Sequence, residues 1–235
     1  MMTTDVAVSR NKRPLSAATT AADNCSSISM SCASEAALHQ AAPLHKRRRL
    51  EEVTNILLRI NPTDYARAAF KANGYGDVEA MQANAIAHFD RPSKDMLQCY
   101  QNEVVAAVRK NDLATVQQMH ESGKLTTNAC NKFGESILHI ACHRGHTELV
   151  RYMIRNMGIN VKTLRDDYHR TALHDACWTT EPNFDIVSLL LEQAPEHILL
   201  KDARGFTPFD YVRKQDQGKW LRFLWERKAM LKPTC

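Results

Sequence analysis

The sequence predicts an all-α fold in which short helix pairs stack side by side as a solenoid. Residues 134–154 have the pattern of two short helices joined by a turn. A pair this short cannot bury its own apolar face and needs copies of itself beside it. Sliding this segment along the chain aligns four positions at steps of 34, 35 and 36 residues: Ala107, Ala141, Ala176 and Val212. The regular spacing predicts four repeats.

Residues 134–154 also show why each helix of the pair should form. Ser136 is placed to cap the first helix, and Gly145 suits the left-handed conformation that often ends a helix. Thr147 is placed to cap the second helix. The apolar residues of that helix recur at helical spacing and predict one buried stripe, made of Leu149, Val150, Met153 and Ile154.

The apolar stripe keeps its phase in the other three units. The pairs equivalent to Leu149-Val150 are Thr115-Val116, Ile186-Val187 and Trp220-Leu221, and those equivalent to Met153-Ile154 are Met119-His120, Leu190-Leu191 and Leu224-Trp225. The extra residues of the longer units fall within residues 158–165 and 179–183, where predicted loops can absorb them. The helices therefore stay in register along the whole array.

The chain resembles the ankyrin repeat family over residues 102–228. That family has a unit of about 33 residues, a turn plus two helices, with the signature T-P-L-H-x-A. Its counterparts here are SILHIA at residues 136–141, TALHDA at 171–176 and TPFDYV at 207–212. The first unit lacks the signature, and the last has Asp210 and Val212 in place of its His and Ala. Atypical end repeats suit a solenoid, because its outermost faces must meet water.

The resemblance implies roles for further residues. A hairpin is expected before three of the units, pairing Asn131 with Gly134, Asp166 with His169, and Asp202 with Gly205. The signature residues His139 and His174 are expected to bond nearby backbone and hydroxyl groups, as a structural role. Partners of such proteins usually meet the hairpin tips and the exposed side of the first helices. We call this surface the concave face.

Residues 1–49 are predicted to be a disordered basic tail. They are rich in Ala, Ser and Thr and contain no aromatic residue, so they cannot bury enough apolar surface to offset the entropy of ordering. Residues 1–50 carry seven Lys or Arg against three Asp or Glu, a balance of +4, while the other 185 residues balance at +1. No apolar run suits a signal peptide or a membrane span, and a transit peptide is the less favoured alternative.

A run of four cations ends this tail, at Lys46, Arg47, Arg48 and Arg49. It suits a nuclear-import receptor, and the alternatives are a solvated charge run or a weak contact with nucleic-acid phosphates. The seven cysteines are scattered and odd in number, which favours a reducing compartment. The expected location is therefore nuclear, cytoplasmic or both.

Residues 50–101 are predicted to be a helical extension outside the repeat register. Helical apolar spacing occurs within 50–60 and again within 77–89, with a shorter helix over 64–71 between them. Ser93 is placed to cap a further helix that leads into the first repeat. We expect this extension to pack on the N-terminal face of the array, with a separate docking helix as the alternative.

Two clusters resemble chemical sites without qualifying as such. His139, Cys142, His143 and His146 lie within eight residues, but the repeat register accounts for the two outer histidines separately. His174 and Cys177 lie three residues apart, but nothing in the sequence supplies an orienting group or an oxyanion hole. No phosphate loop, metalloprotease motif or kinase motif is present. We expect no catalytic residue, metal or cofactor.

The predicted function is that of a non-enzymatic adaptor or scaffold that binds an acidic or phosphorylated protein segment on the concave face. The candidate partner-binding residues combine cations and aromatics, which is the composition of binding hot spots. They are Arg109, Lys110, Lys132, Phe133, His143, Arg144, Tyr168, Arg170, Trp178, Arg204, Phe206 and Lys214. The alternatives are a merely solvated face and a nuclear regulator that contacts nucleic acid through the tail and this face. Membrane contact is not expected.

Overall fold

The computed structural model describes residues 60–74, 89–125 and 129–231. The described residues all belong to one compact unit of the chain. The predicted tail over 1–49 and its cation run at Lys46 to Arg49 lie outside the described residues. So do the helices predicted within 50–60 and 77–89, except for their last residues, Ile60 and Phe89.

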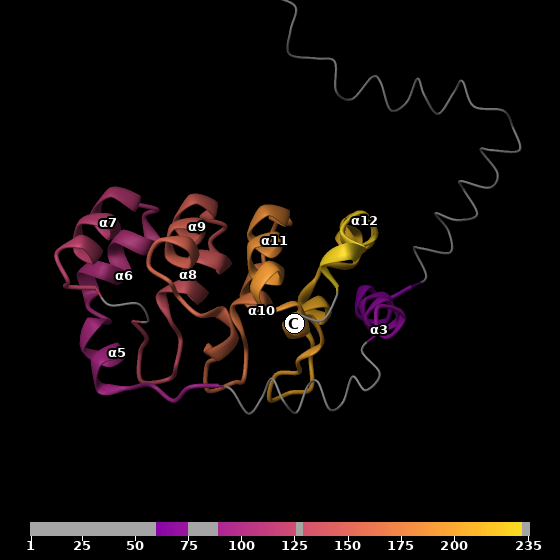
Figure 1. Ribbon diagram of the computed structural model, residues 1–235, viewed down its shortest axis with the longest axis horizontal. Helices are drawn as coiled ribbons and strands as arrows, with labels where there is room; N and C mark the ends of the chain where they lie inside the picture. Colours follow the sequence, from indigo (N-terminus) through magenta and orange to yellow (C-terminus); the bar gives the residue numbers. More distant parts are fainter. Residues whose placement is uncertain (1–59, 75–88, 126–128, 232–235) are drawn as a thin grey trace, which may run out of the picture. The chain divides into compact units, whose positions relative to one another are not determined.

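Helix pairs follow one another along the described array, as Figure 1 shows. The first three pairs are α6 (Asn102–Arg109) with α7 (Leu113–Glu121), α8 (Ile137–His143) with α9 (Thr147–Arg155), and α10 (Ala172–Cys177) with α11 (Phe184–Gln193). The first helices contact one another in the order α6, α8, α10, and the second helices α9 and α11 also touch. Among the described residues the only extended pairing outside helices is one isolated bridge, Cys130 with Ser136. The prediction of an all-α repeat solenoid is confirmed.

The fourth pair is shortened. Its first helix is a single 3-10 turn, η3 (Pro208–Tyr211), after which Val212 is extended. Its second helix is α12 (Gln217–Glu226), and four more 3-10 turns connect or end the units: η1 (Val161–Thr163), η2 (Pro195–Leu199), η4 (Lys214–Asp216) and η5 (Lys228–Met230). Trp225 was expected in the buried stripe, but it is 55% exposed. The stripe is narrower here because α12 is the last helix of the stack.

The N-cap of α8 is the residue predicted from the sequence, whereas the N-cap of α9 is not. The Ser136 hydroxyl caps α8, as predicted, and accepts from the His139 backbone at 3.5 Å. The predicted cap Thr147 is wrong, because His146 occupies that position and α9 begins at Thr147 itself. The Thr147 hydroxyl instead accepts a hydrogen bond of 2.9 Å from the Asn183 amide. It therefore ties the second repeat to the third.

The predicted hairpins are present and also join neighbouring repeats. In each hairpin the fourth residue donates its backbone N–H to the first, at 2.9 Å, in the pairs Gly134–Asn131, His169–Asp166 and Gly205–Asp202. Between hairpins, the Asp167 N–H donates to the Phe133 carbonyl at 2.7 Å, and the Ala203 N–H donates to the Tyr168 carbonyl at 2.8 Å. This chain of backbone bonds fixes the spacing of the hairpin tips.

The extension packs differently from the prediction. Helix α3 (Pro62–Ala72) contacts α12, η2 and η3, at the C-terminal end of the array. Phe70 is fully buried, Thr63 and Thr207 share a hydroxyl hydrogen bond of 2.8 Å, and the Asn73 amide donates to the Leu231 carbonyl at 2.8 Å. The expected packing on the N-terminal face is therefore wrong for α3. The physical reason is that the last repeat has no following repeat to cover its apolar side.

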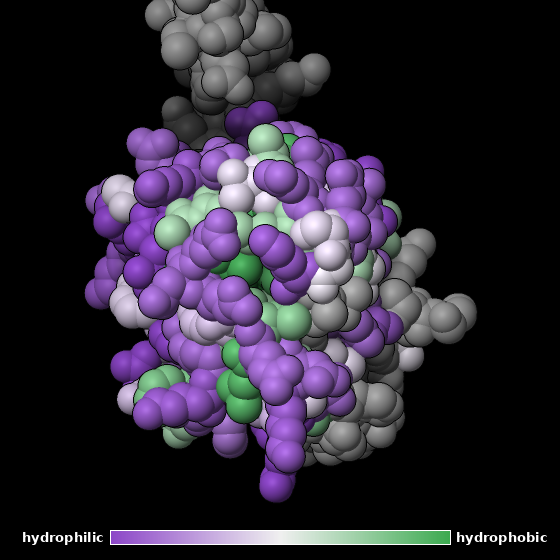
Figure 2. Space-filling model, turned by 90° about the vertical axis from the view of Figure 1, so that its left-hand side faces the viewer, coloured by the Kyte–Doolittle hydropathy of each residue, from purple (hydrophilic) through white to green (hydrophobic). Residues whose placement is uncertain are grey.

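The other described part of the extension does reach the first repeats. Helix α5 (Lys94–Cys99) is capped by Ser93, as predicted. Its Met96 carbonyl accepts from the Cys130 N–H at 3.2 Å. Figure 2 looks at the end where α5, α6 and α7 lie, and shows a mostly hydrophilic surface with small apolar patches between the hydrophilic residues. An end of the stack that meets water should have this character.

Candidate partner-binding face

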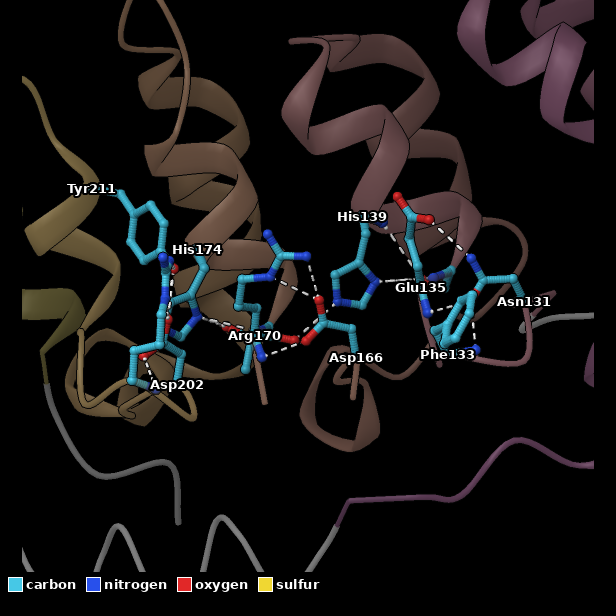
Figure 3. A network of polar contacts seen from close by, with 12 residues as sticks. Asn131, Phe133, Glu135, His139, Asp166, Arg170, His174, Asp202 and Tyr211 are labelled. Atoms are coloured by element: carbon cyan, nitrogen blue, oxygen red, sulfur yellow. Dashed lines mark hydrogen bonds and ion pairs between the residues drawn. The ribbon is translucent and has the colours of Figure 1, made fainter. Parts of the chain in front are cut away.

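The base of the face is a row of neutral histidines at the starts of the first helices. The Ser136 N–H donates to His139 Nδ1 at 3.2 Å, so Nδ1 is the acceptor and Nε2 carries the proton. His139 Nε2 then donates to the Arg170 carbonyl of the next hairpin at 3.3 Å. His174 repeats this arrangement with Thr171 and the Phe206 carbonyl, and Figure 3 shows both rings. Burial lowers the pKa of each ring to about 4, which favours the neutral form.

Buried aspartates at the first hairpin positions organise the arginines above this row. Asp166 accepts from Arg170 Nε at 2.8 Å and pairs with its Nη2 at 2.6 Å. Burial alone would lower the pKa of Arg170, but the hydrogen bond and charge of Asp166 raise it. Asp202 accepts from the Tyr211 hydroxyl at 2.6 Å, and Arg204 in turn donates to that hydroxyl. Both guanidinium groups are thereby held in place, and Figure 3 shows Arg170 beside Asp166.

Large aromatic side chains stand exposed along three successive repeats, each with a cation near its ring. Tyr168 is 58% exposed and Trp178 is 50% exposed, and the Arg170 guanidinium lies 5.4 and 5.8 Å from their ring centres. Phe133 and Phe206 are also exposed, beside Lys132 at 4.9 Å and Arg204 at 5.3 Å. Such cation–π pairs hold the rings without burying them. The Trp178 ring also meets His143 and Tyr211, at 5.4 and 5.7 Å between centroids.

A cup of about 200 Å³ opens on this face between the first three repeats. Arginines from three repeats and the Trp178 indole line it. The complete lining is Arg109, Glu135, His139, Ile140, His143, Arg144, Arg170, Asp175 and Trp178. Asp175 is 8% exposed, and burial raises the pKa of its carboxyl to about 7, with Arg170 opposing and Asp166 and Glu135 reinforcing the shift.

Two wider depressions adjoin other candidate residues. One of about 650 Å³ lies between Arg144 and the loop before α11, residues 179–183. Another of about 170 Å³ includes Lys132 and Phe133 together with Asp90, Arg91 and Pro92 of the extension. The Asp90 N–H donates to the Thr163 carbonyl at 3.0 Å, which anchors the extension there. Part of the hairpin surface is therefore already shared with this chain's own segment.

The structure brings together some of the sequence-predicted residues and leaves others apart. Arg109, His143, Arg144, Arg170 and Trp178 share the cup. Arg204 and Phe206 lie beside Tyr211, whereas Lys110 and Lys214 line none of the depressions above. Of the twelve candidates, Arg170 alone is half-buried, and the other eleven are exposed.

The charge of the face is less one-sided than the sequence count suggests. The candidate positions sum to +5 with Glu135 and Asp167 included. This sum leaves out three buried carboxyls that lie beneath the face, those of Asp166, Asp175 and Asp202. Arg170 and Arg204 are each paired with one of them. The cations left for a partner are therefore chiefly Arg109, Lys110, Lys132, Arg144 and Lys214.

Asp175 and Tyr211 are the functional candidates that sequence reasoning missed. Asp175 directly follows a signature His, and the sequence predicts that a polar residue at this position is exposed to solvent. Its burial depends on neighbours from two repeats, which the sequence pattern does not show. Tyr211 could have been found, because it is an aromatic residue within the last signature motif.

The clusters that resembled chemical sites are engaged in packing. His174 Nδ1 accepts from the Thr171 N–H, so it is not free to take a proton from Cys177. Burial raises the pKa of the Cys142 and Cys177 thiols well above their usual value, which disfavours the nucleophilic thiolate. His146 Nε2 lies 3.4 Å from the Arg109 carbonyl. Within the described ranges no group of three or more His, Cys, Asp or Glu has a metal-binding arrangement.

Stacked helix pairs, hairpin tips and a row of buried histidines define a repeat solenoid that presents one organised surface. A family model for ankyrin repeats, in three copies, matches residues 104–225, just over half of the chain. The chain belongs to the ankyrin repeat family. Ankyrin repeats are protein–protein interaction modules, and the family is typically non-enzymatic. In the described part of the chain, no helix is both long and apolar enough to cross a membrane.

Two curated relatives are similar to part of this chain. A BTB/POZ domain-containing protein of Schizosaccharomyces pombe is 31% identical over 93 residues, which is 39% of this chain and 7% of the relative. An ankyrin repeat protein of fowlpox virus is 29% identical over 122 residues, which is 52% of this chain and 27% of the relative. The chain thus spans well under a third of the length of either relative, so their other parts have no counterpart in the alignment.

Proposed function

We propose that this protein is a non-enzymatic adaptor whose concave face binds an acidic segment of a protein partner. One observation carries the proposal: large aromatic rings remain half-exposed on three successive repeats while cations hold them in place. Large rings are otherwise driven to bury, and arginine with Trp and Tyr is the composition of hot spots. Because the rings and guanidinium groups are already ordered, a partner would lose little side-chain entropy there.

The acidic character of the partner rests on the cations that have no internal role. Arg144 and Arg109 are exposed, and no ion pair between either of them and a described carboxylate was found. Guanidinium groups match carboxylates in a bidentate manner. A segment with carboxylates beside an apolar residue would meet these arginines and Trp178 together.

Affinity capture with the intact chain tests this proposal. The parent protein is compared with a face variant, Arg144→Ala/Trp178→Ala/Arg204→Ala. The matched control is Arg155→Ala/Arg222→Ala/Trp225→Ala, which removes two exposed arginines and one exposed Trp elsewhere on the surface. The expected result is a set of proteins recovered by parent and control and lost by the face variant. Equal recovery by all three proteins would contradict the proposal.

We further propose that Lys46 to Arg49 direct nuclear import, so that the adaptor meets its partner in the nucleus. The support is the run of four cations at the end of a strongly polar segment.

A further inference from the structure

We propose that the cup between the first three repeats is the anchor site for one glutamate or aspartate side chain of the partner, held by Arg109 and Arg144 above the carboxyl of Asp175. This inference rests on the proposed function and names the chemistry of its central contact. The cup is lined by residues of three successive repeats and measures about 200 Å³, which suits one side chain and not a larger ligand.

The two rim arginines supply the attraction. Arg109 is the last residue of α6, and Arg144 is the C-cap of α8, so both leave their helices at the same edge of the face. Arg170 also lines the cup, but its guanidinium is committed to Asp166 at 2.6 and 2.8 Å. The guanidinium groups of Arg109 and Arg144 are therefore available to an incoming anion. One or two guanidinium groups are enough to bind a single carboxylate.

The floor of the cup holds the feature that selects among ligands. Asp175 is 92% buried and borders the cup, and no hydrogen bond between its carboxyl and another described group was found. A largely buried carboxyl that borders an open cup is poorly solvated, and a ligand that supplies a hydrogen bond there improves on the limited solvent access it replaces. When Asp175 carries a proton it is a donor, and a partner's carboxylate is the matching acceptor.

The remaining groups exclude the rival ligands. A cationic side chain would face Arg109, Arg144 and Arg170 together. A phosphoryl group brings close to two charges at neutral pH, and it would face Glu135 on the wall and Asp166 just behind Arg170 as well as Asp175. A carboxylate brings one charge only. The exposed indole of Trp178 forms the last wall and suits an apolar residue next to the acidic one.

Binding of a carboxylate should therefore take up a proton at Asp175. The charged and titratable groups that face Asp175 are Arg170 and Asp166 of its own repeat, Glu135, His139 and His143 of the previous repeat, and the rim arginines. With its pKa near 7, Asp175 is partly ionised at neutral pH, and an incoming anion raises that pKa further. Affinity should fall as the pH rises through this range.

The experiment uses the full chain and an array of acetylated eleven-residue peptides with a central Glu and one Phe or Leu within two positions. The same peptides with a central Gln or phosphoserine are the comparison. The best Glu peptide is then measured in solution at pH 6.0 and pH 8.5. We expect Glu to be preferred over Gln and phosphoserine, and binding roughly tenfold tighter at the lower pH.

Variants assign the effect to the cup. Arg144→Gln and Arg109→Gln should each weaken binding about tenfold or more, the scale of a lost charge-assisted pair. Asp175→Asn, which mimics the protonated carboxyl, should bind at pH 8.5 as the parent does at pH 6.0. His143→Asn, which removes the rim imidazole, should keep the pH dependence of the parent. Thermal unfolding of each variant confirms that it is folded.

Several outcomes would overturn the proposal. Equal binding of Glu and Gln peptides, a preference for phosphoserine, or pH dependence that persists in Asp175→Asn would each do so. If peptide binding is lost in Trp178→Ala and Arg204→Ala but unaffected in Arg109→Gln and Arg144→Gln, the concave face is the binding site and the cup is not its anchor. If no Glu peptide binds, the cup proposal fails, and the capture experiment still judges the proposed function.

Discussion

At the scale of single residues, stability depends on histidines that stay neutral. His139 and His174 each accept from a backbone N–H of their own turn and donate to the carbonyl of the next hairpin, so each joins two repeats. His197 is buried as well, and burial lowers its pKa to about 3. A protonated ring would lose the acceptor at Nδ1 and place a charge in the core.

Acid should therefore unfold the array. The folded pKa values of about 4, 4 and 3 lie below the unfolded value of 6.5, so the unfolded chain binds more protons in this interval. The stability that these three rings contribute is fully present above pH 6.5 and is lost as the pH falls toward 4, and the raised pKa of the single Asp175 carboxyl opposes only part of that loss. Each ring contributes at most roughly 3 to 5 kcal/mol by this linkage. Urea unfolding at pH 7.0, 5.5 and 4.5 should show a steadily falling midpoint, less steeply in His174→Asn. An unchanged midpoint at pH 4.5 would contradict this reading.

Some of these residue roles could be predicted from the sequence and others could not. The structural role of His139 and His174 followed from the family motif, because one local spacing sets both the cap and the ring. The burial of Asp175 and the pairing of Arg204 with Tyr211 and Asp202 did not follow, because they arise where separate segments meet in space. Local sequence encodes the first kind of contact and only the folded chain shows the second.

At the scale of elements, hairpins set the distance between repeats. Gly134 has φ of +79°, and a Cβ there would lie 2.7 Å from the Arg165 carbonyl oxygen of the next repeat. Gly123 has a similar φ of +72° but faces open space. Comparing substitutions at the two glycines therefore distinguishes the cost of backbone strain, which both share, from the cost of a steric clash, which only Gly134 has.

Replacing these two glycines should give different losses. Gly123→Ala should cost about 1 kcal/mol from the left-handed conformation alone. Gly134→Ala should cost about 2 kcal/mol more, because the hairpins must also move apart. Denaturant unfolding of both variants measures the difference. Equal losses would show that the hairpins of the second and third repeats, at Gly134 and Asp166, are not held as closely as described.

The C-terminal end of the array is covered by an element from the other end of the sequence. The short helix over 64–71 was anticipated, and α3 does form there, but its position was not. Its apolar residues indicate only that one side is buried. Which end of the stack they cover depends on the last repeat, which lacks a following neighbour.

Removing the main α3 contact should loosen the last repeat first. Phe70→Ala, at a fully buried ring, should cost about 3–5 kcal/mol. Hydrogen exchange should quicken in α12 and η3 more than in α8 and α10, since stability in a solenoid passes between neighbours. The exposed replacement Lys71→Ala is the control. Uniform loss of protection, or none, would argue against α3 as the cap.

At the scale of the whole molecule, the ankyrin repeats and the N-terminal tail are proposed to have separate functions. The ankyrin unit would bind the partner, and the tail over 1–49 would carry the address. Changing Lys46, Arg47, Arg48 and Arg49 to Ala in a fluorescent fusion too large for passive entry should shift it toward the cytoplasm without altering thermal unfolding. An identical distribution before and after the change would refute the import signal.

Calorimetry of the captured partner, at two salt concentrations, tests the role of the concave face most directly. Arg144→Ala, Trp178→Ala and Arg204→Ala should each weaken binding by roughly thirtyfold, about 2 kcal/mol. Salt dependence should flatten in Arg144→Ala, because that variant removes a charge contact with the partner. It should persist in Trp178→Ala and in Arg204→Ala, because the Arg204 guanidinium is already paired with Asp202. If all three variants bind as the parent does, and the exposed replacements Asp64→Ala and Lys71→Ala on α3 abolish binding while the protein remains folded, then the helical extension is the docking site and the concave face is only scaffold.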